Sequence, residues 1–207
     1  TKYCEIIKNP NDVRYILEKA FYYALEGRPG PVWIDVPLDV QKKVIKTKKL
    51  RKFTIPKSRS LNLDNVKKIN QLCLLLKKSK KPLIIAGNGV KQSGIASDLY
   101  KIINFFSIPL MTSRLANDVY SHNDKFILGL AGIKGSRYCK QIMEESDLIL
   151  SLGCRMAPQL VGHNFNIFKK AKIISVDVEN DELLKRGCKI DIPINMNLVK
   201  FIPFFKN

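Results

Sequence analysis

The sequence predicts an α/β protein built on a doubly wound parallel sheet of five or six strands. From about residue 63 onward, short apolar runs suited to buried strands alternate with segments of helical periodicity. Several of these runs end in glycine or a polar residue, which is typical of the carboxyl ends of parallel strands. Because helices cover both faces of such a sheet, its strands are expected to be continuously apolar.

The first part of the chain, residues 1–41, contains one amphipathic helix and one strand. Apolar side chains recur at helical spacing over residues 13–26, and Gly27 ends that helix. The run at residues 31–37 predicts a short buried strand closed by proline. Residues 42–62 are basic and without a clear period, so we interpret them as a linker between two domains.

The second part, residues 63–207, is expected to form one domain. The expected helices lie at residues 64–78, 94–106, 136–145 and 198–205, and the expected strands at 82–86, 108–112, 147–152, 172–177 and 190–194. The alternation of the two kinds of element predicts strand–helix–strand units, which build a parallel sheet.

Charge is the most unusual feature of the composition. The chain carries 36 Lys and Arg against 18 Asp and Glu, a formal net charge of +18. Such an excess is one mark of a nucleic-acid-binding protein, but here no aromatic or zinc signature accompanies the lysines, which are mostly scattered. We therefore expect a solvated basic surface with no nucleic-acid partner. No apolar run reaches the roughly 18 residues that a membrane span needs, so no membrane partner is expected.

The reactive side chains form no known catalytic pattern. None of the five cysteines belongs to a CxxC pair, and only two histidines are present. This pattern predicts a reducing, cytoplasmic location without disulfides and without a metal site. Neither a GxSxG elbow nor HExxH nor a P-loop is present, so no catalytic residue is expected in these 207 residues. Because Thr1 stands where an initiator Met would, we interpret the chain as part of a longer protein.

Two glycine turns are candidate ligand sites. Gly87, Asn88 and Gly89 follow an apolar strand and precede a helix, where backbone N–H groups favour a phosphate. The third glycine of the dinucleotide fingerprint is replaced by Gln92, so a tight structural turn is an equal alternative. Gly153 ends another strand, two residues before Arg155.

Two charged side chains extend this pattern. Arg155 is placed to hold a phosphate, or alternatively to pair with a neighbouring acid. Asp177 ends a third strand, where a carboxylate accepts ribose hydroxyls; its alternative role is to cap the following helix. Cys154, beside Arg155, is interpreted as a packing residue.

Two long segments carry a family resemblance. The segment GRPGPVWIDVPLDVQ at residues 27–41 resembles the end of the pyrimidine-binding domain of thiamine-diphosphate-dependent enzymes. The runs KPLIIAGNGV, IPLMT, LGLAGIKG and SDLILSLGCR resemble the strands and turns of their Rossmann-like central domain, in which residues 128–135 would be a loop. The nearest likeness is to acetolactate synthases.

This resemblance implies a carboligase or decarboxylase acting on 2-keto acids such as pyruvate. Thiamine diphosphate and Mg²⁺ would bind in domains outside this chain, which by itself would be inactive. The missing domains and a second subunit, in a homodimer or homotetramer, are the implied partners.

Some relatives hold FAD in the central domain. The corresponding positions in this sequence are Gly87, Gly89, Thr112, Gly132, Gly153, Arg155 and Asp177. The sequence departs from the FAD-binding pattern at residues 156–159, at Lys134 and at Asn195 or Asn197. A purely architectural central domain is therefore the alternative to FAD binding, and a freestanding NAD- or FAD-binding module of the same fold is the alternative to the whole assignment.

Overall fold

The computed structural model describes the chain except for residues 57–61, 122, 163–166, 186 and 206–207. It forms two compact units, Thr1–Ser60 and Leu61–Asn207, and each is described by itself.

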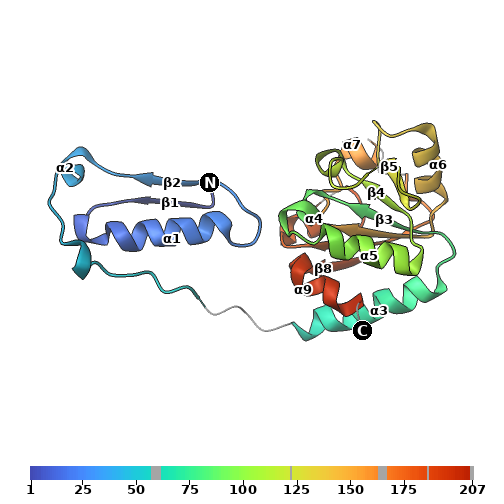
Figure 1. Ribbon diagram of the computed structural model, residues 1–207, viewed down its shortest axis with the longest axis horizontal. Coiled ribbons are helices and arrows are strands. Elements are labelled where there is room, and N and C mark those ends of the chain that lie inside the picture. Colours follow the sequence, from blue (N-terminus) through green and yellow to red (C-terminus); the bar gives the residue numbers. More distant parts are fainter. Residues whose placement is uncertain (57–61, 122, 163–166, 186, 206–207) are drawn as a thin grey trace. The chain divides into compact units, whose positions relative to one another are not determined.

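The second unit contains a six-stranded sheet in which all paired strands are parallel (Figure 1). Its strands are β3 (Pro82–Ala86), β4 (Leu110–Thr112), β5 (Ile127–Leu130), β6 (Leu148–Leu152), β7 (Lys172–Asp177) and β8 (Ile192–Asn195). They lie in the order β5-β4-β3-β6-β7-β8. From β3 the chain adds β4 and β5 on one side, and then returns to add β6, β7 and β8 on the other side of β3. The strand order therefore reverses between β3 and β6, which is the doubly wound arrangement. The predicted fold class is confirmed.

Helices cover both faces of this sheet. They are α3 (Leu63–Lys78), α4 (Asn88–Gln92), α5 (Ala96–Phe106), α6 (Arg137–Glu145), α7 (Pro158–Val161), α8 (Asn180–Leu184) and α9 (Leu198–Phe201), with 3₁₀ turns η3 (Arg114–Ala116) and η4 (Ile202–Phe205). Successive residues of β3 point to opposite faces: Ile84 packs in one hydrophobic core with α3, α5 and α9, and Ile85 in a second with α6 and α7. Two-sided burial explains why the strands are apolar at every position.

Local signals place the helix ends. The side chain of Asn62 accepts a hydrogen bond from the Asp64 N–H, and that of Ser136 accepts one from the Cys139 N–H, so each caps its helix. α5 ends at Ser107, which has a left-handed backbone with φ of 54°. These caps agree with the boundaries that the sequence predicts for α3 and α6.

Several short elements differ from the sequence-based prediction. The helices α2 (Leu38–Gln41) and α7 were not expected, and three further differences follow. Residues 128–130, expected in a loop, belong to the edge strand β5, and Asn88 and Gly89 lie in the one-turn helix α4. β1 (Tyr3–Ile6) is not predicted at all. All three elements have only four or five residues, which is too short for a clear period, and β5 contains Gly129 at φ of 112°.

The first unit is a thin α/β layer. β1 pairs in parallel with β2 (Val32–Asp35), and α1 (Val13–Leu25) contacts both strands. The small buried core consists of Ile7, Ile16 and Val40, the last on the short helix α2 (Leu38–Gln41). Alternate strand residues, including Ile6 and Trp33, are exposed.

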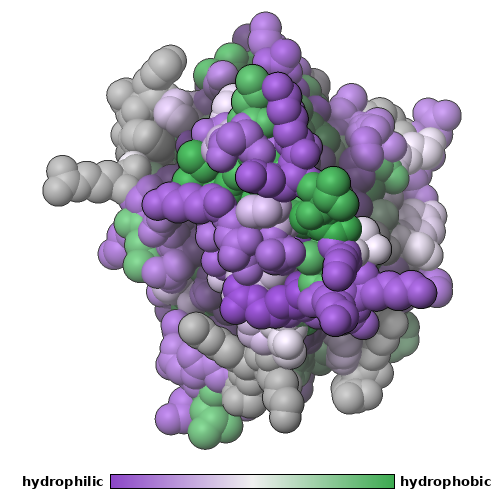
Figure 2. All heavy atoms as spheres, turned by 90° about the vertical axis from the view of Figure 1, so that its left-hand side faces the viewer, coloured by the Kyte–Doolittle hydropathy of each residue, from purple (hydrophilic) through white to green (hydrophobic). Residues whose placement is uncertain are grey.

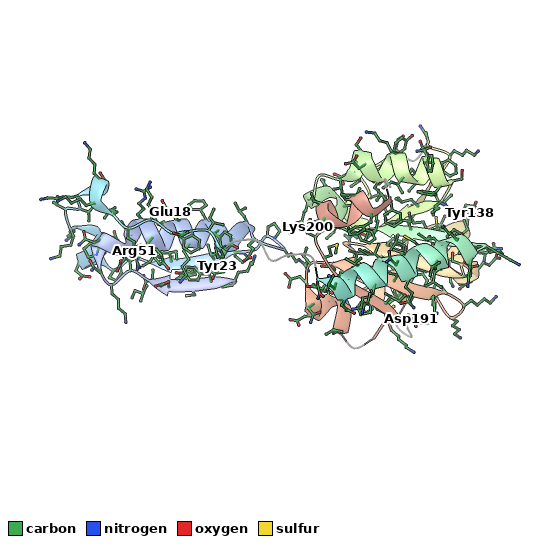
Figure 3. All side chains as sticks on the ribbon, turned by 90° about the horizontal axis from the view of Figure 1, so that it is seen from below. Glu18, Tyr23, Arg51, Tyr138, Asp191 and Lys200 are labelled. Atoms are coloured by element: carbon green, nitrogen blue, oxygen red, sulfur yellow. The ribbon has the colours of Figure 1, made fainter. Side chains whose placement is uncertain are left out.

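Part of the expected linker packs on the first unit. Phe53 lies against the rings of Tyr15 and Tyr22, and its N–H donates to Glu18 across 2.7 Å. The Arg51 guanidinium lies 3.8 Å from the centre of the Tyr15 ring; Glu18 and Arg51 are labelled in Figure 3. The segment expected to be a linker is therefore partly packed, because the side chains of Arg51 and Phe53 contact α1. Short 3₁₀ turns at Pro10–Asp12 and Thr47–Lys49 complete this unit.

Figure 2 shows one face of the molecule, mostly hydrophilic, on which hydrophobic side chains form separate small patches. Within the described ranges, no helix is both long and apolar enough to cross a membrane.

Candidate functional site

The candidate site lies where the strand order reverses, at the carboxyl ends of β3 and β6. In doubly wound sheets this is the usual place for a ligand, held by backbone N–H groups. Here those N–H groups bond to the neighbouring chain: Gly87 donates to the Leu152 carbonyl across 2.9 Å, and Gly89 to the Gly153 carbonyl across 3.0 Å. Gly153 in turn donates to the Val176 carbonyl. The three glycine N–H groups are thus satisfied within the protein.

Close backbone packing explains why glycine stands at these positions. A Cβ atom on Gly87 would lie 2.1 Å from the Gly153 carbonyl oxygen, and one on Gly89 would lie 2.7 Å from the Gly153 Cα. Gly153 also has a left-handed backbone, with φ of 52°. The turn after β3 thus packs directly against the turn after β6. These contacts agree with the alternative that the glycines form tight structural turns. Asn88 is the first residue of α4 beside this contact and is half-buried.

The two charged candidates have protein partners. The Arg155 Nε lies 3.0 Å from a carboxylate oxygen of Glu182 on α8, and Lys185 pairs with the same carboxylate. The Asp177 carboxylate accepts the Glu179 N–H across 3.0 Å, in the turn that leads into α8. The pairing alternative for Arg155 therefore agrees with the structure, although its side chain is 65% exposed. Glu182 was missed by sequence analysis, because nothing in the spacing shows which acid faces a given arginine.

The other two candidates lie on the β4–β5 side of the sheet. Thr112 ends β4, is fully buried, and its Oγ1 lies 3.4 Å from Asn117 Oδ1 and 3.5 Å from the Gly129 carbonyl. Gly132 follows β5 with φ of 93°, and a Cβ there would lie 2.6 Å from the Gln159 carbonyl. Thr112 thus lies close to Asn117 and to β5, and Gly132 packs against the backbone of α7. The structure brings Gly87, Gly89 and Gly153 into contact, but gives Thr112 and Gly132 different neighbours.

The cysteine beside the candidate arginine is a packing residue. Burial raises the pKa of the Cys154 thiol to about 12, so a thiolate is disfavoured at neutral pH. Burial also raises the pKa of Cys188. In the part of the chain that the structure describes, no three His, Cys, Asp or Glu side chains gather in a way that could hold a metal ion.

A cleft of about 660 Å³ lies beside Gly132. It is bordered by α6, by the end of α7 and by residues 167–170, and four basic side chains line it. None of these four was singled out from the sequence. They come from two segments about 30 residues apart, and only the fold brings them together.

The contacts of Gly87, Gly89, Gly153 and Arg155 are those of closely packed turns at the edge of the sheet. FAD binding needs donors and cations for its diphosphate, but the three glycine N–H groups donate to protein carbonyls and Arg155 is paired with Glu182. At the reversal point, the N–H groups of Gly87, Gly89 and Gly153 and the Arg155 guanidinium therefore bond to the protein itself and are not the free donors that an FAD diphosphate needs.

Known proteins resemble this chain over most of its length. It is 32% identical over 185 residues, 86% of this chain and 30% of the relative, to a probable acetolactate synthase large subunit of Methanococcus aeolicus. It is 31% identical over 197 residues, 94% of this chain and 33% of the relative, to a probable acetolactate synthase large subunit of Methanocaldococcus jannaschii. The acetolactate synthase large subunit of Corynebacterium glutamicum is 29% identical over 94% of this chain and 31% of the relative. The chain thus spans about a third of the length of these curated relatives.

A family model described as the thiamine pyrophosphate enzyme, central domain, matches residues 69–202. The matched range runs from α3 to the start of η4 and includes every strand of the six-stranded sheet. The chain therefore belongs to the thiamine pyrophosphate enzyme family, and residues 69–202 are its central domain.

Proposed function

We propose that this chain is the central part of a thiamine-diphosphate-dependent carboligase or decarboxylase of the acetolactate synthase type, acting on 2-keto acids such as pyruvate in the cytoplasm. The observation that carries the proposal is the likeness to acetolactate synthase large subunits, which extends over 86% to 94% of the chain. Thiamine diphosphate and Mg²⁺ would be held by parts of the protein outside these 207 residues, and the chain by itself would be inactive.

Residues 1–41 are proposed to be the last part of the preceding, pyrimidine-binding domain. Parallel strands are normally covered on both faces. In the first unit, however, Trp33 on β2 and Ile6 on β1 are 65% and 41% exposed. This incomplete layer supports a role as one piece of a larger sheet, which the rest of that domain would complete. A second subunit, in a homodimer or homotetramer, is the further proposed partner.

The central domain itself is proposed to be architectural. The hydrogen bonds between the turns after β3 and β6 support this role, because they use the N–H groups of Gly87, Gly89 and Gly153 within the protein. The same contacts argue against the second reading of the chain, a freestanding NAD- or FAD-binding module.

The activity is tested on the complete protein. With pyruvate, thiamine diphosphate and Mg²⁺, we expect consumption of pyruvate and formation of a carboligation or decarboxylation product, and no turnover by the 207-residue chain. A complete protein that turns over no 2-keto acid would refute the proposal.

The architectural role is tested by cofactor retention. After incubation with excess FAD and desalting, the chain is expected to show no flavin absorbance between 300 and 550 nm, and a titration with NAD is expected to show no saturable binding. The same FAD measurement on the complete protein provides the control. A flavin band retained by the complete protein would contradict an architectural central domain.

A further inference from the structure

The cleft beside α6 has an unbalanced charge. Among its lining residues are four basic side chains, Arg137, Lys140, Lys169 and Lys170, and one acid, Glu144. The single carboxylate lies 3.8 Å from the Lys140 ammonium on the same helix face. Within the described residues, no ion pair joins Arg137, Lys169 or Lys170 to a carboxylate, although the charge of Lys170 helps to lower the pKa of Glu145, after the contributions of Lys81 and Gln141. Among the residues that line the cleft, four cations against one carboxylate leave an excess of three positive charges.

The first turn of α6 adds donors to the same cleft. Ser136 and Arg137 line it, and the Ser136 side chain caps only the Cys139 N–H. The first N–H groups of any helix lack partners within the helix and favour an anion. For the N–H groups of Arg137 and Tyr138, the described residues offer no acceptor. The helix has nine residues, so its N-terminal field adds to that of the basic side chains.

Part of the cleft lining is apolar. Ile133, Leu160, Val161 and Ile167 line the cleft together with the backbone of Gly132 and Gly135. Leu160 and Val161 are buried in the core on the α6 side of the sheet. A volume of about 660 Å³ is within the usual range for small-molecule sites, which combine apolar walls with a few polar groups.

From this combination we propose that the cleft binds an organic phosphate. Its phosphate group would lie among Arg137, Lys140, Lys169 and Lys170 at the start of α6, and its apolar body against Ile133, Leu160 and Ile167. The guanidinium group of Arg and the ammonium group of Lys are the usual protein partners of phosphate oxygens. The proposal does not depend on the activity of the complete protein, and the cleft is separate from the turns that join β3 and β6.

The probe for this site is 1-naphthyl phosphate, which joins a dianionic head to a flat apolar body. Titration calorimetry of the 207-residue chain is expected to show saturable binding that weakens as salt is raised. Inorganic phosphate lacks the body and 1-naphthol lacks the charge, so each is expected to bind at least fivefold more weakly.

Matched charge changes locate the site. The double variant K169Q/K170Q is expected to weaken binding of 1-naphthyl phosphate by at least tenfold. The control K77Q/K78Q removes the same charge from two exposed lysines at the end of α3, a helix that packs on the other core of the sheet. It is expected to change the dissociation constant by less than twofold.

Three results would overturn the proposal. These are no saturable binding of 1-naphthyl phosphate at millimolar concentration, equal weakening in both double variants, or equal affinity for 1-naphthol. Circular dichroism of each variant shows whether it is folded. Should K169Q/K170Q fail to fold, R137Q replaces it and the same outcomes apply.

Discussion

The two units of this chain differ in how completely each one buries its own sheet. In the second unit, β3 and β6 pair with strands on both sides, and all five residues of β6 are buried. In the first unit, the core cluster has only three buried residues, none of them within its two strands, and Trp33 on β2 is exposed. Burial of apolar surface is the main source of folding free energy. The second unit is therefore expected to be an independently stable domain, and the first is expected to be the less stable of the two.

The largest expected effect comes from truncating the larger core. Ile149 lies in the middle of β6 and is fully buried, so Ile149→Ala is expected to lower the free energy of unfolding of the second unit by about 4 kcal/mol. Urea titration followed by far-ultraviolet circular dichroism measures this change. Ile16→Ala in the first unit is expected to cost about 2 kcal/mol, because its core is small and relaxes more readily.

The fluorescence of the single tryptophan allows unfolding of the first unit to be followed separately in that experiment. Trp33 lies in β2, so its fluorescence reports on the first unit. If Ile149→Ala moved the Trp33 transition as far as the circular dichroism transition, the units would unfold together and the contrast drawn above would be wrong.

The second effect tests the contact between the turns after β3 and β6. Gly87→Ala is expected to cost about 3 kcal/mol, because its Cβ would lie 2.1 Å from a backbone oxygen that cannot move alone. Gly94→Ala is the matched control: Gly94 has φ of 67° but open space around it, so only backbone strain of about 1 kcal/mol is expected. Equal losses in thermal unfolding would show that space at Gly87 does not matter.

The smallest effect concerns the carboxylate that joins the ends of α3 and β6. Asp147 accepts hydrogen bonds from Ser79 and from the N–H groups of Lys80 and Lys81. Burial raises the pKa of this carboxyl, but the hydrogen bonds outweigh burial and lower the pKa overall. Asp147→Asn is expected to cost about 1 kcal/mol at pH 7.

The pH dependence of that loss has a definite sign. A carboxyl whose pKa is lower in the folded state stabilises the fold above its unfolded pKa of about 3.9, and this stabilisation is lost as pH falls through the folded pKa. The difference between the parent chain and Asp147→Asn should therefore shrink below about pH 4. Glu144→Gln, at an exposed site, is the control. A difference that stayed constant down to pH 2 would contradict the role given to the Asp147 charge.

Sequence analysis predicted the long elements better than the contacts. The continuous apolar run at residues 82–86 coincides with β3, and helical spacing places α3 within one residue at its start. The short elements β1 and α4 were missed, because four or five residues do not establish a period. For the candidate site, the glycine turns were found but their contacts were not, since a glycine that admits a ligand and one that admits a neighbouring backbone look the same in sequence.

By itself, the sequence determined the parallel α/β fold of the second unit, because periodicity and two-sided burial are encoded locally along each strand and helix. It also carried the family resemblance that the comparisons confirmed, in the motifs around residues 82–89 and 146–155. The tertiary structure decided that Gly87 and Gly89 pack on Gly153, that Arg155 pairs with Glu182, and that four basic side chains from two distant segments face one cleft. Such contacts join residues far apart in the chain, and only the folded arrangement of strands and loops sets the distances between them.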